Sequence, residues 1–295
     1  MYDIIIVGAG PAGLSCALYA LRANKKVLVL EAKSYGGQIV NAHKVENYPG
    51  IPMISGFDYA TNLYNQVKEL GATIKFEQVI EVTEDKKVKT TKDTYQAKAI
   101  ILATGAQRRK LNIENEEEYI GKGISYCATC DGNFYKNKTV AVIGGGNTAL
   151  EEATYLSNIA DKVYLIHRRD TFKGEEKVLD ELKEKANVEI LYNTKVYKIK
   201  GQEVLESIVV KVQDTDKELK IDGLFVAIGQ NPQNEVFAPL IELDSYGYIA
   251  SKDGVHTNIK GIYVAGDARV KHLRQLTTAT SDGAIAATTA IEELE

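Results

Sequence analysis

The chain has 295 residues, which favours two domains over one because domains usually span about 100 to 200 residues. With 44% hydrophobic and 26% charged residues, its composition is that of a globular protein and excludes disordered, collagenous and coiled-coil classes. The net charge of −4 provides no basic excess for a nucleic acid backbone or an anionic membrane, so we expect neither as a partner.

The cysteine content and the N-terminus indicate the compartment. Three cysteines, an odd number, do not make a disulfide framework and point to a reducing environment. Met1-Tyr2-Asp3 leads directly into a short apolar stretch, without the basic and apolar regions of a signal peptide, and no apolar run approaches the roughly 20 residues of a bilayer span. We therefore expect a cytoplasmic protein.

The first predicted elements form a β-α-β unit. An apolar strand ends at Val7, a glycine-rich turn follows over residues 8–13, a helix is predicted from about residue 12 to 24, and a second strand ends at Glu31. This order of elements is typical of a dinucleotide-binding domain.

The glycine-rich turn has the spacing G-x-G-x-x-G. Gly8 would permit the tight turn, Gly10 would let a pyrophosphate approach the backbone, and Gly13 would allow close packing of helix and strand. Glu31, at the end of the second strand, can accept hydrogen bonds from ribose hydroxyls. The alternative of a plain turn is disfavoured because strand, helix and acidic residue are all in place.

A C-x-x-C motif, Cys127 and Cys130, precedes the second half of the chain. Its spacing allows an internal disulfide, and a thiolate there could attack a flavin or another disulfide. The motif could also be half of a zinc site, but Cys16 is the only other cysteine and the four histidines lack ligand spacing, so we expect no metal. Cys16 itself is expected to pack inside a helix.

Acidic residues flank this motif on both sides. Asp131 is a candidate acid that would protonate a leaving thiolate or the reduced flavin, and the alternative is that it caps a helix. The acidic run 114–118 is expected to be a solvated face or an interdomain loop.

A second β-α-β unit follows, with strands predicted over 139–143 and 163–166 and a helix over 147–158. Its turn has the spacing G-x-G-x-x-A, in which Gly144 and Gly146 are the glycines and Ala149 stands at the close-packing position.

The end of this second strand differs from the first unit. Where Glu31 stands in the first, His167, Arg168 and Arg169 stand here, and guanidinium groups pair with a 2′-phosphate that a carboxylate would repel. The pattern favours NADPH over NADH, the alternative being that these side chains form a solvated surface. Two dinucleotide sites of opposite charge suggest a flavin in the first and NADPH in the second.

The last sixty residues are too few to fold alone easily. They contain a predicted strand over 262–265 and a helix over 279–294, and we expect them to complete the first domain. The predicted fold class is therefore α/β, with two Rossmann-like dinucleotide-binding domains, the second inserted into the first. Residues 1–108 and 233–295 form the FAD-binding domain, and residues 109–232 form the NADPH-binding domain with the dithiol.

The chain resembles the bacterial low-molecular-weight thioredoxin reductases over essentially its whole length. The Cys-Ala-Thr-Cys-Asp sequence inside a nucleotide-binding insertion is the most specific match, whereas glycine motifs alone would indicate only a flavoprotein with two dinucleotide sites. The other matching segments are Gly8–Gly13, Gly36–Gln38, Glu46–Gly50, Ala103–Ala106, His167–Arg169, Gly266–Asp267 and Arg274–Gln275.

The resemblance implies the positions of several flavin contacts. Gln38 and Asn47 would lie near the flavin, Asp267 on the ribityl chain, and Arg274 and Gln275 close to the isoalloxazine. The final helix would point its N-terminus at the pyrimidine edge and stabilise the anionic reduced form.

The resemblance also implies the roles of the two sulfurs and a moving domain. Cys130 would exchange electrons with the flavin, and Cys127 would attack the disulfide of thioredoxin. Members of the family are homodimers and rotate the inserted domain between two arrangements, which places a hinge near residues 109–113 and 229–235.

The sequence departs from the family pattern in three places. Asn147 stands where Asp is frequent, Lys173 replaces an arginine and offers a point charge near the 2′-phosphate, and Gln233-Asn234 follows Pro232. Two alternatives stay open: a flavin-dependent thioredoxin reductase fed by ferredoxin, which the second glycine turn disfavours, and a non-catalytic sensor that signals through its dithiol.

Overall fold

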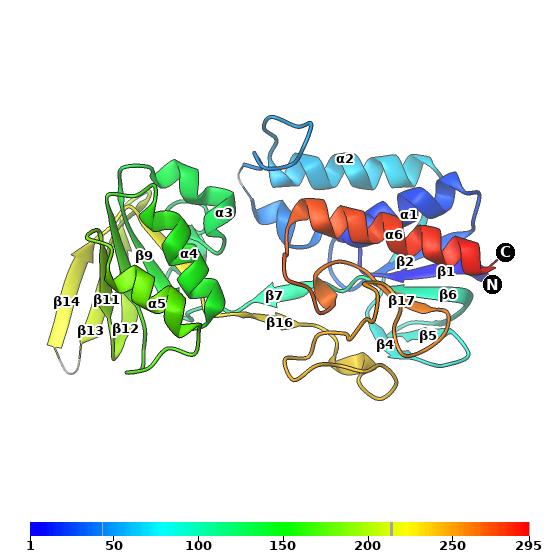
Figure 1. Ribbon diagram of the computed structural model, residues 1–295. Coiled ribbons are helices and arrows are strands. Elements are labelled where there is room, and N and C mark those ends of the chain that lie inside the picture. The colour runs from blue at the N-terminus through cyan, green and yellow to red at the C-terminus, as the bar shows by residue number, and fades with distance from the viewer. Residues whose placement is uncertain (43, 213–214, 295) are drawn as a thin grey trace. The chain divides into compact units, whose positions relative to one another are not determined.

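The computed structural model describes residues 1–42, 44–212 and 215–294 (Figure 1). The chain forms two compact units, one made of Met1–Gln107 with Asn231–Glu295 and the other of Arg108–Gln230. The domain changes expected at residues 109 and 233 fall within two residues of these boundaries.

The first unit is built on a sheet with the strand order β3-β2-β1-β6-β5-β4, in which β17 also pairs with β6. Residues 4–7 of β1 are buried on both faces, which is typical of an apolar run in a parallel sheet. The strands are β1 (Tyr2–Val7), β2 (Val27–Glu31), β3 (Thr73–Phe76), β4 (Val79–Val82), β5 (Lys87–Thr90), β6 (Thr94–Leu102) and β17 (Ile262–Val264).

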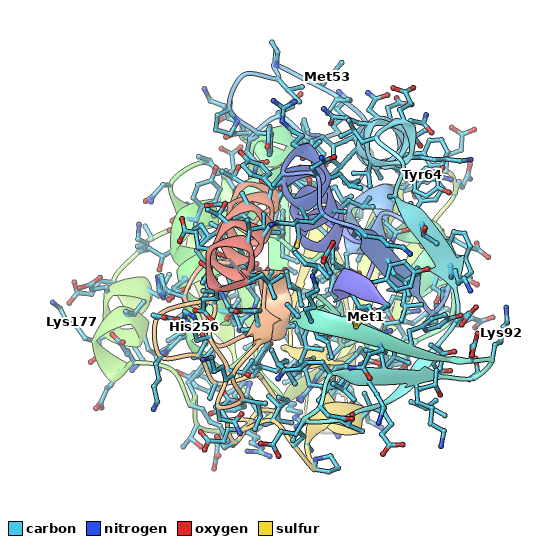
Figure 2. All side chains as sticks on the ribbon, turned by 90° about the vertical axis from the view of Figure 1, so that its right-hand side faces the viewer. Met1, Met53, Tyr64, Lys92, Lys177 and His256 are labelled. Atoms are coloured by element: carbon cyan, nitrogen blue, oxygen red, sulfur yellow. A yellow bond between two sulfur atoms is a disulfide. The ribbon has the colours of Figure 1, made fainter. Side chains whose placement is uncertain are left out.

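Three helices cover this sheet: α1 (Pro11–Arg22), α2 (Gly56–Glu69) and α6 (Leu276–Leu294). The last of them returns from the C-terminus to pack against the first (Figure 1). The contact is close because a Cβ atom at Gly283 of α6 would lie 2.1 Å from the carbonyl oxygen of Ala12. On α2, Tyr64, labelled in Figure 2, stacks on Tyr35 with ring centroids 4.2 Å apart.

The second unit is built on a parallel sheet of strand order β11-β10-β9-β15-β8. Helices α4 (Asn147–Ser157) and α5 (Glu176–Lys183) pack on the apolar residues of this sheet. An antiparallel sheet of order β12-β13-β14 shares a second apolar core with it. The strands are β8 (Ile124–Ser125), β9 (Thr139–Gly144), β10 (Lys162–Ile166), β11 (Val188–Leu191), β12 (Thr194–Gly201), β13 (Leu205–Val212), β14 (Thr215–Lys220) and β15 (Gly223–Ala227).

Residues 219–228 read as one apolar stretch in the sequence, but the structure divides them between two strands. β14 pairs antiparallel with β13, whereas β15 lies in the parallel sheet between β9 and β8. The chain changes sheet at Asp222, whose backbone N–H donates to the carbonyl of Thr139 at 2.7 Å. An apolar run alone could not reveal this change.

The chain passes between the units through two short strands that pair with each other, β7 (Ala106–Arg108) and β16 (Gln230–Pro232). Over the part of the chain that the structure describes, the remaining elements are helix α3 (Ala128–Asp131) and the 3-10 helices η1 (Gly37–Asn41), η2 (Glu116–Tyr119), η3 (Gly132–Tyr135), η4 (Glu235–Phe237) and η5 (Gly266–Ala268). Among the described residues, no helix is long and apolar enough to cross a membrane.

Candidate active site with two nucleotide turns and a dithiol

The first glycine turn connects β1 to α1 with the geometry that its spacing predicts. Gly8 has a φ of 110°, and a Cβ there would lie 2.3 Å from the carbonyl oxygen of Ala103. A Cβ at Gly13 would lie 1.9 Å from the carbonyl oxygen of Gly8. At Gly10 a Cβ would meet only the Cα of Gly37, at 4.0 Å, so of the three glycines this one leaves an open space for an added atom.

That open space fits a phosphate group. Gly10 is the N-cap of α1 and no side chain caps the helix, so the first N–H groups are available to an anion. The second turn offers the same arrangement, since Gly146 is the uncapped N-cap of α4 and nothing lies within 4 Å of the Cβ position there.

Glu31 is held in place at the end of β2. One carboxylate oxygen accepts the backbone N–H of Ala9 at 2.9 Å, and the other accepts that of Lys33 at 2.9 Å. The acidic group predicted to bind ribose hydroxyls is therefore tied to the glycine turn.

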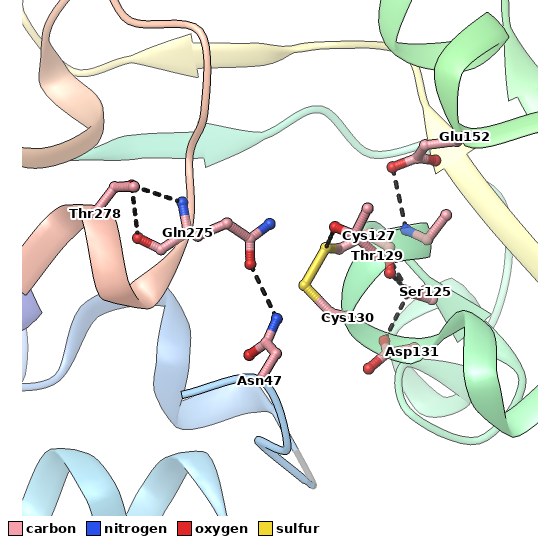
Figure 3. The surroundings of a disulfide bond; sticks show 10 residues. Asn47, Ser125, Cys127, Thr129, Cys130, Asp131, Glu152, Gln275 and Thr278 are labelled. Atoms are coloured by element: carbon pink, nitrogen blue, oxygen red, sulfur yellow. Dashed lines mark hydrogen bonds between the residues drawn. A yellow bond between two sulfur atoms is a disulfide. The ribbon is translucent and has the colours of Figure 1, made fainter. Parts of the chain in front are cut away.

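Two of the predicted flavin contacts are brought together by the structure. The side-chain amide of Asn47 donates to Oε1 of Gln275 at 3.1 Å (Figure 3). Gln275 precedes α6, and its backbone N–H donates to Thr278 Oγ1 at 3.1 Å. These two residues join a loop near residue 47 to the start of the final helix.

The other predicted flavin contacts lie in the same unit on separate segments. Gln38 is exposed on η1, and the guanidinium of Arg274 lies over the ring of Tyr248, 4.1 Å from its centroid. Asp267 lies on η5 with one buried carboxylate oxygen, and the ammonium group of Lys271 is 3.9 Å from that oxygen.

The basic residues predicted to bind a 2′-phosphate do not share one environment. Arg168, Arg169 and Lys173 are exposed on the loop that follows β10. His167 is buried, and its Nε2 donates to the carbonyl oxygen of Thr171 at 2.9 Å, which assigns the proton to that nitrogen. Three cations therefore face solvent, while the imidazole packs beneath them.

Cys127 and Cys130 form a disulfide across the start of helix α3, as Figure 3 shows. Both cysteines are partly exposed, as a reactive pair must be. Ser125 accepts the backbone N–H of Cys127 at 3.1 Å and donates its hydroxyl to the Asp131 carboxylate at 2.7 Å. Asp131 is thus held beside the dithiol by a side chain of β8.

Glu152 is a residue that the sequence did not single out. It lies on α4, and its Oε1 accepts the backbone N–H of Ala128, between the two cysteines, at 3.3 Å (Figure 3). Burial raises the pKa of this carboxyl to about 7, and the positive charge of Arg108 offsets only part of that effect. Its place in the helix, among the buried residues Ala149, Ala153 and Leu156, was the available signal.

A second missed carboxylate lies in the acidic run 114–118, which was predicted to be solvated. Its other acidic residues are exposed, but Glu116 is buried. Its oxygens accept the backbone N–H groups of Leu111 and Asn112, each at 2.8 Å, and the hydroxyl of Tyr126 at 2.7 Å. The prediction is wrong at this residue because a carboxylate with three donors can be buried.

Cys16 lies fully buried in α1, where burial raises the pKa of its thiol and keeps it protonated. In the residues that the structure describes, no cluster of three or more histidine, cysteine or acidic side chains could hold a metal ion. Of the three cysteines, Cys127 and Cys130 are the partly exposed ones, so the sulfur that a partner could reach belongs to that pair.

Comparison with known proteins identifies the family. The model of the pyridine nucleotide-disulphide oxidoreductases matches residues 2–283. A thioredoxin reductase of Treponema pallidum is 44% identical over 292 residues, covering 97% of this chain and 95% of the relative. A thioredoxin reductase of Listeria innocua is 42% identical over 304 residues, covering 100% and 95%.

A solved structure agrees with these relatives. The crystal structure of thioredoxin reductase from Streptococcus pyogenes matches with a TM-score of 0.94 at 38% identity, covering 100% of this chain and 98% of that one. The chain therefore belongs to the pyridine nucleotide-disulphide oxidoreductase family, among the low-molecular-weight thioredoxin reductases that its motifs resemble.

Proposed function

We propose that the chain is a thioredoxin-disulfide reductase that takes electrons from NADPH through FAD and passes them to thioredoxin through the Cys127–Cys130 pair. The observation that carries this proposal is the disulfide itself. It is partly exposed, and it lies in the same unit as the second of two glycine turns that can each receive a dinucleotide.

The donor groups fit the two cofactors in different units. FAD would be held at the first turn by the open N-terminus of α1 and by Glu31, with Asn47 and Gln275 near its ring system. NADPH would be held at the second turn by the N-terminus of α4, with Arg168 and Arg169 toward its 2′-phosphate. FAD, when bound, supplies the conversion of a hydride from the nicotinamide into an electron pair for the disulfide.

The two sulfurs then carry the exchange with the partner. The Cys127 thiolate attacks the thioredoxin disulfide, which forms a mixed disulfide and releases one partner thiolate. The Cys130 thiolate attacks the sulfur of Cys127, which restores the internal disulfide and releases the second partner thiolate. Two electrons leave the chain in this cycle, and two protons are taken up by the reduced partner.

Asp131 can relay one of these protons: its carboxylate would take up a proton from solvent and pass it, as a carboxylic acid, to the departing thiolate. Its carboxylate receives the Ser125 hydroxyl at 2.7 Å, and Ser125 also accepts the backbone N–H of Cys127. The acid and the attacking cysteine are therefore tied to one side chain, which keeps the proton donor next to the leaving thiolate.

An anaerobic reductive titration of the purified holoenzyme tests the donor. We expect the flavin absorbance to bleach with stoichiometric NADPH and far more slowly with NADH. Bleaching by reduced ferredoxin but not by NADPH would instead identify the ferredoxin-fed reductase. Bleaching without turnover on any thioredoxin would favour the redox sensor.

Substitution of one sulfur tests the electron path. Cys130→Ser should leave FAD bound and reducible by NADPH while turnover with thioredoxin falls below detection, because the internal disulfide cannot form. The matched variant Cys16→Ser removes a thiol from the buried core and should keep turnover. Loss of the flavin in Cys130→Ser would contradict the assigned role.

The homodimer that the resemblance implies is also part of this proposal. Light scattering of the holoenzyme at micromolar concentration should give twice the mass of the chain. A mass equal to one chain would remove the dimer from the proposal and leave the electron path untouched.

A further inference from the structure

The loop that carries the exposed cations folds back onto the second glycine turn. The carbonyl oxygen of Gly145 accepts the backbone N–H of Lys173 at 2.7 Å and that of Gly174 at 3.2 Å. The loop and the turn are therefore joined through the middle residue of the G-x-G sequence.

Asn147 makes a second connection at the far end of the loop. Its Oδ1 accepts the backbone N–H of Glu175 at 2.8 Å, at the residue that caps helix α5. The contact is tight, because a Cβ at Gly174 would lie 3.0 Å from the same oxygen. Asn147 thus fixes where the loop ends and α5 begins.

His167 makes a third connection at the near end. Its ring covers Gly145 so closely that a Cβ there would lie 2.0 Å from Cε1 of the imidazole. The same ring donates to the carbonyl of Thr171 at 2.9 Å and packs on Phe172 with ring centroids 4.6 Å apart. The imidazole therefore holds the first half of the loop from inside.

These three connections bracket the exposed cations. Arg168 and Arg169 lie between His167 and Thr171, and Lys173 donates directly to Gly145. A loop that is already ordered loses less conformational entropy when it binds a ligand, so it binds more tightly with the same contacts. The distance between the pyrophosphate turn and the cations is then set by the protein and not by the nucleotide.

We propose that Asn147 and His167 are positioning residues that preset the loop 168–174 for a nucleotide 2′-phosphate without touching that phosphate themselves. The inference rests on the proposed use of NADPH. Asn147 stands where the family pattern often has aspartate, and an aspartate oxygen could accept the same Glu175 N–H. His167 would support the loop from inside instead of binding the phosphate.

Two nucleotide fragments isolate the effect in the holoenzyme. Adenosine 2′,5′-bisphosphate and 5′-AMP differ only in the 2′-phosphate, so the ratio of their dissociation constants by calorimetry reports that group alone. We expect Asn147→Ala to reduce this ratio about tenfold, the equivalent of the backbone entropy of one released residue. His167→Ala should reduce it to a similar extent.

A matched variant identifies the cause. Asn147→Asp retains an oxygen that accepts the Glu175 N–H, so the ratio should stay within about threefold of the wild type even if both fragments bind more weakly. Hydrogen exchange without nucleotide gives a second readout. Protection of the Glu175 amide should be lost in Asn147→Ala and kept in Asn147→Asp.

The outcomes separate this inference from the proposed function. A wild-type ratio near one would refute the use of NADPH. A wild-type preference that Asn147→Ala or His167→Ala leaves intact, or that Asn147→Asp loses as fully as Asn147→Ala, would overturn the positioning role. Flavin content and melting temperature exclude general unfolding, and if Asn147→Ala does not fold, His167→Ala and Asn147→Asp decide.

Discussion

Each glycine turn is hydrogen-bonded to residues at or after the end of the second strand of its β-α-β unit, but the turn donates to Glu31 in the first unit and accepts from the loop in the second. At the first turn, a backbone N–H of the turn donates outward to the Glu31 carboxylate. At the second, a carbonyl of the turn accepts from Lys173 and Gly174, and the Asn147 side chain accepts from Glu175. One architecture thus presents an anchored acid in one unit and anchored cations in the other.

The helices that follow the turns differ at equivalent positions. Cys16 stands three residues after Gly13 and Glu152 three residues after Ala149. In the first unit this face packs closely on α6, where a Cβ at Gly283 would lie 3.0 Å from the backbone nitrogen of Cys16. In the second it faces helix α3, where the Glu152 carboxylate accepts the backbone N–H of Ala128 between the two cysteines.

The largest predicted effect concerns the last residue of each turn pattern, which is Gly13 in the first unit and Ala149 in the second. Gly13→Ala would place a methyl group 1.9 Å from the carbonyl oxygen of Gly8, and backbone cannot move aside cheaply. We expect a loss of about 3 kcal/mol and poor retention of flavin. Flavin absorbance per chain and thermal unfolding measure both.

The matched change in the other unit is Ala149→Gly, which removes a methyl group that the second turn accommodates. It should cost only about 1 kcal/mol, the helix penalty of glycine. If both variants retain flavin and melt alike, the closer packing of the first turn has no energetic consequence.

The second predicted effect concerns the anchored acid. Glu31→Gln leaves one acceptor oxygen for two backbone donors, so either Ala9 or Lys33 loses its partner. An unsatisfied donor costs about 1–3 kcal/mol, and we expect FAD to bind apoprotein roughly tenfold more weakly. Reconstitution followed by flavin fluorescence gives the affinity, with Glu69→Gln at the exposed end of α2 as control.

The third prediction concerns Glu152 and pH. Its pKa is raised to about 7 by burial, above the ordinary value of 4.5, so the folded chain binds the proton more tightly than the unfolded chain. Stability should therefore fall as pH rises from about 4.5 to about 7. Glu152→Gln, which retains an oxygen for the Ala128 N–H, should raise the melting temperature by a few degrees at pH 8 and little at pH 5.

Glu151→Gln provides the control for that experiment, because Glu151 is the exposed neighbour on the same helix. It should change the melting temperature equally at both pH values. A pH-independent effect of Glu152→Gln would mean that the carboxyl titrates normally.

The smallest predicted effect lies at the end of α6. His256, labelled in Figure 2, contacts Glu293 at 2.6 Å and Asp253 at 2.5 Å, and the two carboxylates, Glu293 first, raise its pKa. Its stabilisation should be complete below the ordinary value of 6.5 and should vanish as pH rises through the folded pKa. Because the ring is partly exposed, we expect at most about 1 kcal/mol.

Replacement of this histidine measures that contribution. His256→Asn should lower the melting temperature at pH 6 and leave it unchanged at pH 9, whereas His272→Asn, at an exposed site, should have no effect at either pH. A loss of equal size at both values would show that packing, and not charge, is responsible.

The sequence predicted those parts of the fold that depend on a few adjacent residues. The turns at Gly8 and Gly144, the helices that follow them and the Cys127–Cys130 motif all depend on a few adjacent residues, and the structure contains them. The C-terminal strand and helix were expected in the first unit because sixty residues bury too little surface alone, and β17 indeed pairs with β6.

What the sequence did not reveal depends on distant segments. Glu116 was predicted to be solvated, but the Tyr126 hydroxyl donates to it, and Glu152, for which no role was predicted, accepts the backbone N–H of Ala128. The basic run after β10 gave no sign that His167 points inward, because only the glycine at position 145 makes room for the ring. Burial of polar groups follows from tertiary partners, which neighbouring residues do not specify.

The discontinuity of the first unit determines the order in which the chain can fold during translation. β17 and α6 are synthesised after the inserted unit, yet β6 and α1 need them as partners. The inserted unit is contiguous and can form while the ribosome is still at work, so the amino-terminal strands must wait, with apolar surface uncovered, until the final helix emerges. Truncation that removes α6 would therefore leave α1 and the amino-terminal strands, which were synthesised first, without the helix that covers them.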